Sequence, residues 1–173
     1  MTAPFDVEPH LGVLRRYALV LTRSPDEAED LLQDALVRAI AAAGTWRPGS
    51  DARPWLLSIL HNTHVSRRRR RQVEAAAAHE LALEPPAMAP PRQLARVQLG
   101  QTMTALMRLP DDQREVLTLV ALEGMAYKDA AEILGLPTGT LMSRLARARE
   151  ALRRALDGDG AGEAERPDLR VVR

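Results

Sequence analysis

Arginines and hydroxyl side chains between residues 138 and 156 are the groups best suited to binding chemistry. At about 100° per residue they share one face of a helix, and this face comprises Thr140, Ser143, Arg144, Arg147 and Arg154. The stretch holds five arginines but one acid, Glu150. Arginine bridges two acceptors on guanine or holds phosphates, and hydroxyl groups suit both roles. The pattern indicates a nucleic-acid contact, and a merely solvated charged face is the alternative.

A second basic group is the unbroken run of arginines at 67–71. Such a run holds phosphates, complements the dipole at a helix C-terminus, or stays solvated. Single-stranded DNA requires cationic side chains along its backbone and a platform for unstacked bases. Trp46 and Trp55 precede the run and can supply that platform, although a tryptophan is more often part of a core. The combination favours nucleic-acid contact.

Neither catalysis nor metal binding is indicated. His61 and His64 are three residues apart on an expected helix, but no cysteine or neighbouring carboxylate completes a zinc site. The sequence contains no glycine-rich phosphate loop, nucleophile elbow or paired-acid motif. We therefore expect no enzyme activity, no metal and no cofactor.

The composition favours helices. With 46% hydrophobic but 3% aromatic residues, the apolar side chains are mainly Ala, Leu and Val, which suit helix packing. The formal net charge of +1 attracts a polyanion weakly, so nucleic-acid binding depends on local clusters. The absence of cysteine fits a reducing compartment. No secretion signal is apparent, and no apolar run approaches the roughly 20 residues that cross a bilayer. We expect an all-α cytoplasmic protein without membrane insertion.

Three helices are expected in the first half of the chain. Apolar residues at helical spacing predict the first helix from residue 11 to residue 21, and Ser24 caps a second that runs to about residue 43. A turn at 46–51 precedes a third helix, from 55 to at least 70, which begins after a cap at Ser50 or Asp51. This helix carries one apolar stripe and a second line of residues, Leu57, His61, His64 and Arg68.

A linker is expected at 73–91, between the first and second halves of the chain. It begins near an alanine run and ends in four prolines. The alanines can instead prolong the preceding helix. From residue 92 we expect further helices, one of them capped by Asp111 or Asp112 and ended by Gly124. Helices at 127–134 and from 138 onward, joined through Gly135, form a helix-turn-helix candidate. Residues 158–173 are expected to be a disordered tail.

Four motifs resemble, in the correct order, the extracytoplasmic-function class of the sigma-70 family of RNA polymerase sigma factors. They are residues 28–34 (AEDLLQD), 54–62 (PWLLSILHN), 109–117 (LPDDQREVL) and 139–149 (GTLMSRLARAR). The resemblance covers nearly all of residues 10–156. It implies two small helical domains, the sigma region 2 bundle at 8–72 and the sigma region 4 helix-turn-helix at 92–157, joined by a flexible Ala/Pro-rich linker.

The function that this resemblance implies is that of an alternative sigma factor, which binds core RNA polymerase and directs promoter-specific initiation. The resemblance further implies that the turn at 46–52, with Asn62 nearby, captures a base flipped from the minus-ten element, so that melting uses binding energy and not hydrolysis. The residues implied to bind the polymerase are Asp30, Gln33 and Asp34. Those implied to bind the minus-ten element are Trp46, Arg47, Ser50, Trp55, His61, Asn62, Arg67 and Arg68. Those implied to bind the minus-thirty-five element are Thr138, Thr140, Ser143, Arg144 and Arg147.

Two positions depart from the family pattern. Ser66 stands where the family usually has an aspartate, and His64 stands where the residue is more often small. These departures leave the class assignment intact but affect which promoter sequence the chain is expected to recognise. The resemblance also implies an anti-sigma partner. The main rival hypothesis is a stand-alone helix-turn-helix regulator, which leaves Asp30, Gln33 and Asp34 without a role. A helical adaptor that binds only protein is the third reading.

Overall fold

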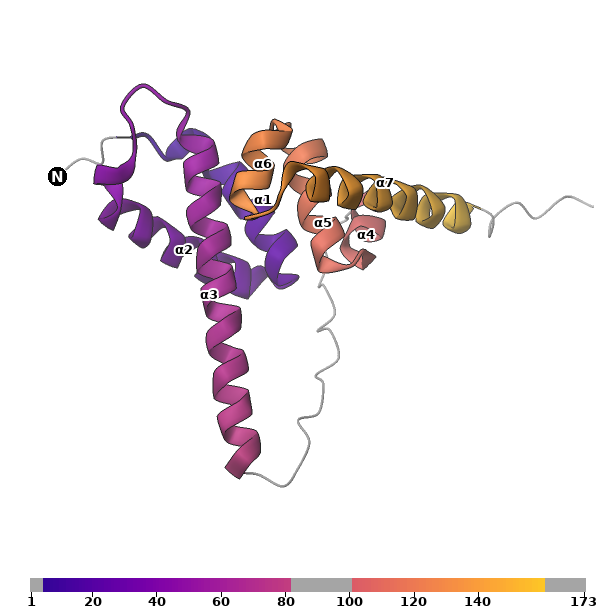
Figure 1. Cartoon of the computed structure of the whole chain (residues 1–173), viewed down its shortest axis with the longest axis horizontal. Coiled ribbons are helices and arrows are strands. Elements are labelled where there is room, and N and C mark those ends of the chain that lie inside the picture. The colour runs from indigo at the N-terminus through magenta and orange to yellow at the C-terminus, as the bar shows by residue number, and fades with distance from the viewer. Residues whose placement is uncertain (1–4, 82–100, 161–173) are drawn as a thin grey trace, which may run out of the picture.

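The structure is a computed structural model that describes residues 5–81 and 101–160, and every regular element in these two ranges is a helix. Figure 1 shows two groups of helices packed side by side, with α3 projecting from one group and α7 from the other. We call them the N-terminal domain (η1 to α3) and the C-terminal domain (α4 to α7). The prediction of an all-α chain with two small helical domains is confirmed.

The N-terminal domain is built from η1 (Glu8–His10), α1 (Leu11–Thr22), α2 (Pro25–Ala41), η2 (Ala43–Thr45) and α3 (Ala52–Leu81). Ser24 caps α2 as predicted, because its side chain accepts a hydrogen bond from the backbone N–H of Glu27. Of the two residues expected to precede α3 as a cap, Asp51 accepts a hydrogen bond from the backbone N–H of Arg53 at 2.9 Å. Ser50 instead donates to the carbonyl of Arg47.

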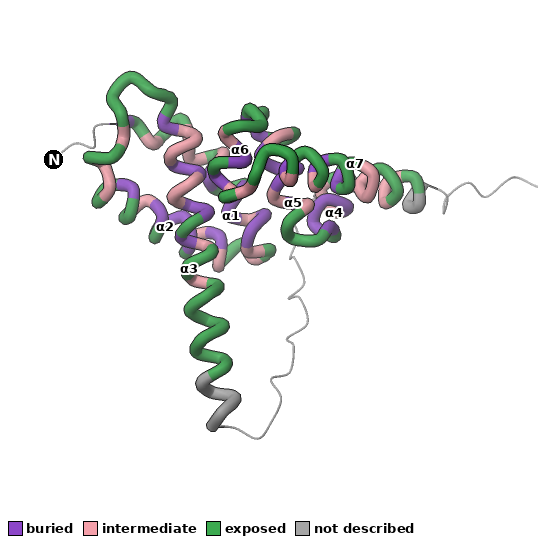
Figure 2. Tube along the Cα trace, in the orientation of Figure 1, coloured by how far each residue is buried: buried purple, intermediate pink, exposed green. Residues whose placement is uncertain are grey.

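The alanine run prolongs α3, which is one of the two outcomes left open by the sequence. Alanine has the highest helix propensity, and the first proline comes only at residue 85. Residues 73–81 of the expected linker are therefore helical. The expected linker residues 82–91, and the start of the next predicted helix, lie outside the described residues. In Figure 2 the described turns of α3 beyond the domain body are exposed.

The C-terminal domain is built from α4 (Gln101–Arg108), α5 (Asp111–Leu117), the π-helical turn η3 (Thr118–Leu122), α6 (Tyr127–Ile133) and α7 (Thr138–Gly160). Gly124 follows η3 and Gly135 follows α6, with φ of 63° and 61° respectively. Glycine enters this left-handed region without steric cost, which explains both helix ends. Helix α7 extends three residues past the predicted boundary at 157, and residues 161–173 of the expected tail lie outside the described residues.

The predicted aspartate cap of α5 is wrong. Pro110 is the N-cap residue, and no side chain accepts a capping hydrogen bond there. Asp111 lies within the first turn, where its charge complements the helix dipole. Its carboxylate accepts hydrogen bonds from Arg114 at 2.8 Å and from Arg23 at 2.9 Å. Because guanidinium groups engage the carboxylate, it does not serve the backbone amides as a cap.

The two domains share one continuous apolar core. They meet where α1 and α3 contact α5, η3 and α6. This contact accounts for the second line of residues on α3, since Leu57 is fully buried and His61 is 8% exposed. Each buried leucine contributes about 1.5–3 kcal/mol relative to an exposed one. The second line is thus a packing face toward the other domain.

Candidate nucleic-acid and protein interfaces

Helix α7 separates an apolar seam from a polar face, as its sequence predicts. Leu141, Leu145 and Ala148 are buried, while Ser143 and Arg147 are exposed. The seam packs on α4, α5 and α6. Helix α6, the Gly135 turn and α7 thus form a helix-turn-helix unit in which α7 presents side chains to solvent, the arrangement that enters a major groove.

The individual residues of the polar face differ in their surroundings. Thr138 and Arg147 are exposed, whereas Thr140 is half-buried and its carbonyl accepts a hydrogen bond from Ser143. Arg144 lies at the edge of the face, with its Nε 3.6 Å from the Asp112 carboxylate. The predicted residues therefore lie together, but Arg144 already has an acidic neighbour within its own domain.

Met142 is an exposed apolar residue of α7 that was not predicted from the sequence. At about 100° per residue it projects roughly 140° away from Arg147, on the side of Thr138. Its side chain is 52% exposed, next to the exposed Gly139 and Ser143. An apolar side chain on a helix that enters the major groove can contact the methyl group of thymine. The signal that was available is an apolar residue outside the leucine seam of an amphipathic helix.

Three aromatic rings position the turn at 46–51. Phe5 stacks edge-on against Trp46 and Trp55, with ring centroids 5.8 Å and 4.9 Å apart. The Trp55 indole N–H donates to the Thr45 hydroxyl at 3.2 Å. Phe5 lies outside every sequence motif, so its role was not predicted. Both tryptophans are half-buried, and the cluster fixes the turn that exposes Arg47 and Ser50.

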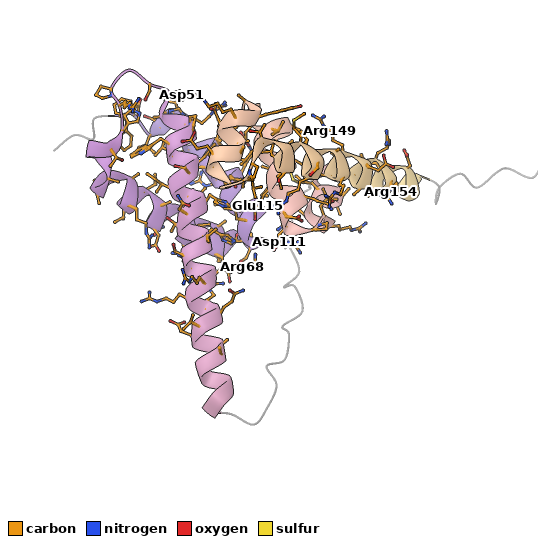
Figure 3. The ribbon with its side chains drawn as sticks, viewed as in Figure 1. Asp51, Arg68, Asp111, Glu115, Arg149 and Arg154 are labelled. Carbon is orange, nitrogen blue, oxygen red and sulfur yellow. The ribbon has the colours of Figure 1, made fainter. Side chains whose placement is uncertain are left out.

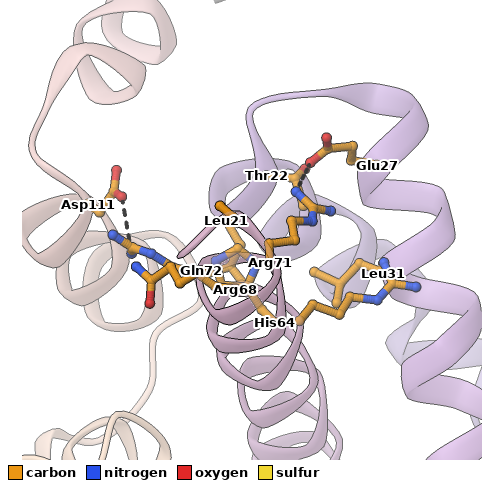
Figure 4. Close-up of a pocket in the computed structure, with 11 residues that line it drawn as sticks. Leu21, Thr22, Glu27, Leu31, His64, Arg68, Arg71, Gln72 and Asp111 are labelled. Atoms are coloured by element: carbon orange, nitrogen blue, oxygen red, sulfur yellow. Dashed lines mark hydrogen bonds and ion pairs between the residues drawn. The ribbon is translucent and has the colours of Figure 1, made fainter. Parts of the chain in front are cut away.

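Basic side chains from the middle of α3 line a pocket of about 440 Å³ against α1 and α2. Figure 4 shows Arg71 directed toward Glu27 and Arg68 directed toward Asp111, with contacts of 3.4 Å and 3.5 Å. Arg67 donates to the Asp34 carboxylate at 3.0 Å and also to the backbone carbonyl of Asp30. Asn62 is exposed. The arginines expected to hold DNA thus have acidic partners within the chain.

His61 differs from the other predicted minus-ten residues because it is buried between the domains. Its Nδ1 lies 3.2 Å from the Tyr17 hydroxyl and 3.8 Å from the Glu115 carboxylate. Burial, and then nearby His64, lowers the pKa of His61 from 6.5 to about 4. Burial, and then Asp111, raises the pKa of Glu115 from 4.5 to about 7. Near pH 6 both groups therefore favour the neutral form that a buried site requires.

Helix α2 presents the acidic face predicted for a protein partner. Asp30, Gln33 and Asp34 are all exposed on it. Val37 and Ile40, which are 66% and 62% exposed, continue this face by one and two turns. These two residues were not predicted from the sequence. A polar patch with an apolar extension is typical of a protein interface.

Among the described residues, no group of three or more histidine, cysteine, aspartate or glutamate side chains is arranged to hold a metal ion. No helix in the described ranges has both the length and the apolar character required to cross a bilayer.

Comparison with known families gives two matches in the order of the two domains. The model "Sigma-70 region 2" matches residues 7–74. The model "Sigma-70, region 4" matches residues 99–152.

Curated relatives match across most of the chain. The sigma factor EcfG of Rhodopseudomonas palustris is 41% identical over 159 residues, which are 90% of this chain and 86% of EcfG. The sigma factor SigM of Mycobacterium tuberculosis is 36% identical over 148 residues, which are 85% of this chain and 73% of SigM. Both are described as extracytoplasmic-function RNA polymerase sigma factors.

Solved structures agree with the sequence matches. The sigma factor RpoE of Bartonella quintana, in complex with the anti-sigma factor NepR, is 37% identical with a TM-score of 0.71 and covers 88% of this chain and 95% of its own. CnrH, in complex with the cytosolic domain of CnrY, is 27% identical with a TM-score of 0.60. The match covers 88% of this chain and 86% of CnrH. The chain therefore belongs to the extracytoplasmic-function class of the sigma-70 family, as an alternative sigma factor that directs transcription initiation.

Proposed function

We propose that the chain docks on core RNA polymerase through α2, captures minus-ten DNA with the 46–51 turn and α3, and reads the minus-thirty-five element with α7. The observation that carries this assignment is the separation of charge between helices. The exposed face of α2 is acidic, whereas α7 buries Leu141 and Leu145 and exposes Arg147. Oppositely charged surfaces suit a basic protein partner and a polyanion respectively.

The docking surface consists of Asp30, Gln33 and Asp34, extended by Val37 and Ile40. These five side chains are exposed along one face of α2. The acidic residues supply electrostatic steering, and the two apolar residues supply area that is desolvated on binding. A stand-alone DNA-binding regulator would have no use for this face, and the match to sigma region 2 disfavours that alternative.

The minus-ten surface consists of Trp46, Arg47, Ser50, Trp55, Asn62, Arg67 and Arg68, with His61 behind it. The aromatic cluster around Phe5 supports a turn at which an unstacked base can be captured. The arginines of α3 suit the phosphate backbone of the single strand. Melting by this route uses binding energy, so the chain needs no catalytic activity of its own.

The minus-thirty-five surface consists of Thr138, Thr140, Ser143, Arg144 and Arg147, to which Met142 is added. Arginine recognises guanine in the major groove, and the methionine suits a thymine methyl group. We assign region 2 to residues 8–72 and region 4 to residues 92–157, which the two family matches support.

An anti-sigma protein is the proposed resting partner. Support comes from RpoE of Bartonella quintana, a similar sigma factor whose structure was solved in complex with the anti-sigma factor NepR. A cytoplasmic location follows from the proposed work on polymerase and promoter DNA.

The docking assignment is tested by the affinity of Gln33→Ala combined with Asp34→Ala for core polymerase. We expect at least a tenfold loss with unchanged thermal unfolding, because both side chains are exposed. The control is Arg67→Ala, which breaks the contact to Asp34 from the other side. Unchanged affinity of the double variant would remove α2 from the interface.

A further inference from the structure

Arg144 lies at the border between the polar face and the apolar seam of α7. At about 100° per residue its side chain projects roughly 40° from Thr140 and roughly 60° from the buried Leu141. The Arg144 side chain is 31% exposed, whereas Arg147 is exposed in the middle of the face. A long side chain at such a border can adopt several rotamers, and a neighbouring group that binds it limits this freedom.

Asp112 is the neighbour that binds Arg144. It lies in the first turn of α5, which packs against α7 within the C-terminal domain. A carboxylate oxygen of Asp112 lies 3.6 Å from Nε of Arg144, and no other cation of the described ranges lies within ion-pair distance of Asp112. The adjacent Asp111 differs, because Arg23 and Arg114 engage its carboxylate. Asp112 is therefore available to Arg144.

The atom through which Arg144 meets Asp112 determines what the rest of the guanidinium can bind. A guanidinium carries five N–H donors in a planar fork. Since Asp112 lies against Nε, the two terminal amino groups remain, and they donate to no residue that the structure describes. Two parallel N–H groups of this kind match O6 and N7 of guanine. The fork is thus held from behind by a carboxylate of another helix.

We propose that Asp112 is a positioning residue for minus-thirty-five recognition, which holds Arg144 at Nε so that both terminal amino groups face a guanine in the major groove. The inference rests on the proposed function of α7. An ordered guanidinium loses less side-chain entropy on binding, so the contact with that base becomes tighter and more selective. The negative charge of Asp112 repels phosphates, and only its hold on Arg144 favours promoter binding.

Other roles for Asp112 lead to different results. If the carboxylate only neutralised Arg144, its removal would free the cation and tighten binding to every promoter sequence alike. If its charge only complemented the dipole of α5, its removal would lower the unfolding temperature and weaken binding to every sequence alike. A change in the preference for one base is expected only of a positioning residue.

The test measures the preference for one guanine, with the full chain in complex with core polymerase. Promoter fragments carry 7-deazaguanine, which lacks the N7 acceptor, in place of single guanines of the minus-thirty-five element. The guanine that Arg144 contacts is the one whose replacement weakens binding of the unmodified chain but not of Arg144→Ala. The affinity for guanine divided by the affinity for 7-deazaguanine is the measured ratio, in which a general change in attraction for phosphates cancels.

We expect a ratio of roughly ten for the unmodified chain, because the lost hydrogen bond has a charged donor. Asp112→Asn keeps the size of the side chain and removes its charge, and it should lower the ratio to about two, because a neutral amide holds a guanidinium weakly.

The matched control is Glu150→Gln, which also removes one negative charge beside an arginine of α7. Glu150 lies 3.5 Å from Nε of Arg154. Figure 3 shows Arg154 near the far end of α7, away from Asp111 and Glu115 of α5. This control should keep the ratio of the unmodified chain.

The proposal is overturned if Asp112→Asn keeps the ratio of the unmodified chain, if Glu150→Gln lowers the ratio equally, or if no guanine depends on Arg144. In the first two outcomes Arg144→Ala still loses the preference for that guanine, so the proposed function of α7 stands. Failure of core polymerase with the unmodified chain to initiate at any promoter would instead reject the proposed function.

Discussion

At the scale of single residues, His61 and Glu115 are the most unusual pair, because a buried imidazole and a half-buried carboxyl group lie beside each other between the domains. The lowered pKa of His61 means that its protonation, as the pH falls from 6.5 toward 4, opposes the closed contact. The raised pKa of Glu115 means that its ionisation, as the pH rises from 4.5 through 7, also opposes it. The contact between the domains is then most stable between pH 4.5 and pH 6.5, the ordinary pKa values of the two groups.

The raised pKa of Glu115 leads to a prediction on how the contact between the domains depends on pH. Fluorescence energy transfer between dyes on the two domains should fall as the pH rises from 6 to 8, because the Glu115 carboxyl ionises near Asp111 and Asp112. Arg68 and Arg114 offset the repulsion between these carboxylates only in part. Glu115→Gln removes the ionisation and should flatten the profile in this window. An unchanged pH profile in this variant would show that another group is responsible.

The residue scale also sets the limit of prediction from sequence. The resemblance assigned His61 to the minus-ten surface, but the histidine is buried against Tyr17 and Glu115. Tyr17 and Glu115 are 44 and 54 residues away in sequence, and no local pattern joins them. The assignment of His61 to DNA stays a prediction, because α5 lies against the imidazole in this structure.

At the scale of elements, periodicity predicted the helices and their buried faces well. The leucine seam of α7 and the Ser24 cap of α2 are local patterns, and both occur in the structure. The cap of α5 was wrong because Arg23, from another element, and Arg114, from α5 itself, engage the Asp111 carboxylate. Local rules fail where a tertiary partner takes the group that the rule assigns.

The exposed face of α7 gives a prediction at this scale. Replacing each thymine of the minus-thirty-five element by deoxyuridine removes one methyl group, and one such replacement should weaken binding by about 0.8 kcal/mol, or roughly fourfold. In Met142→Ala the same replacement should have no effect, since the contact is already lost. Equal sensitivity in both proteins would show that Met142 does not contact a thymine methyl group.

At the scale of the whole molecule, a net charge of +1 conceals separate acidic and basic surfaces. These surfaces partly neutralise each other, through Arg67 with Asp34 within the N-terminal domain and Arg68 with Asp111 between the domains. The composition predicted helices, and the small net charge meant that nucleic-acid binding had to depend on local clusters of basic residues. The composition contained no information on how the domains meet. That contact depends on Arg114 and Glu123, which no sequence motif distinguished as interdomain residues.

The most direct measurement of the central claim is run-off transcription of genomic fragments by purified core polymerase with and without this chain. The account predicts discrete transcripts from a limited promoter set when both are present, and none from either alone. Arg144→Ala should reduce transcription from that set while core binding persists. Tight binding to one specific duplex without polymerase, together with no transcript from any fragment, would contradict it.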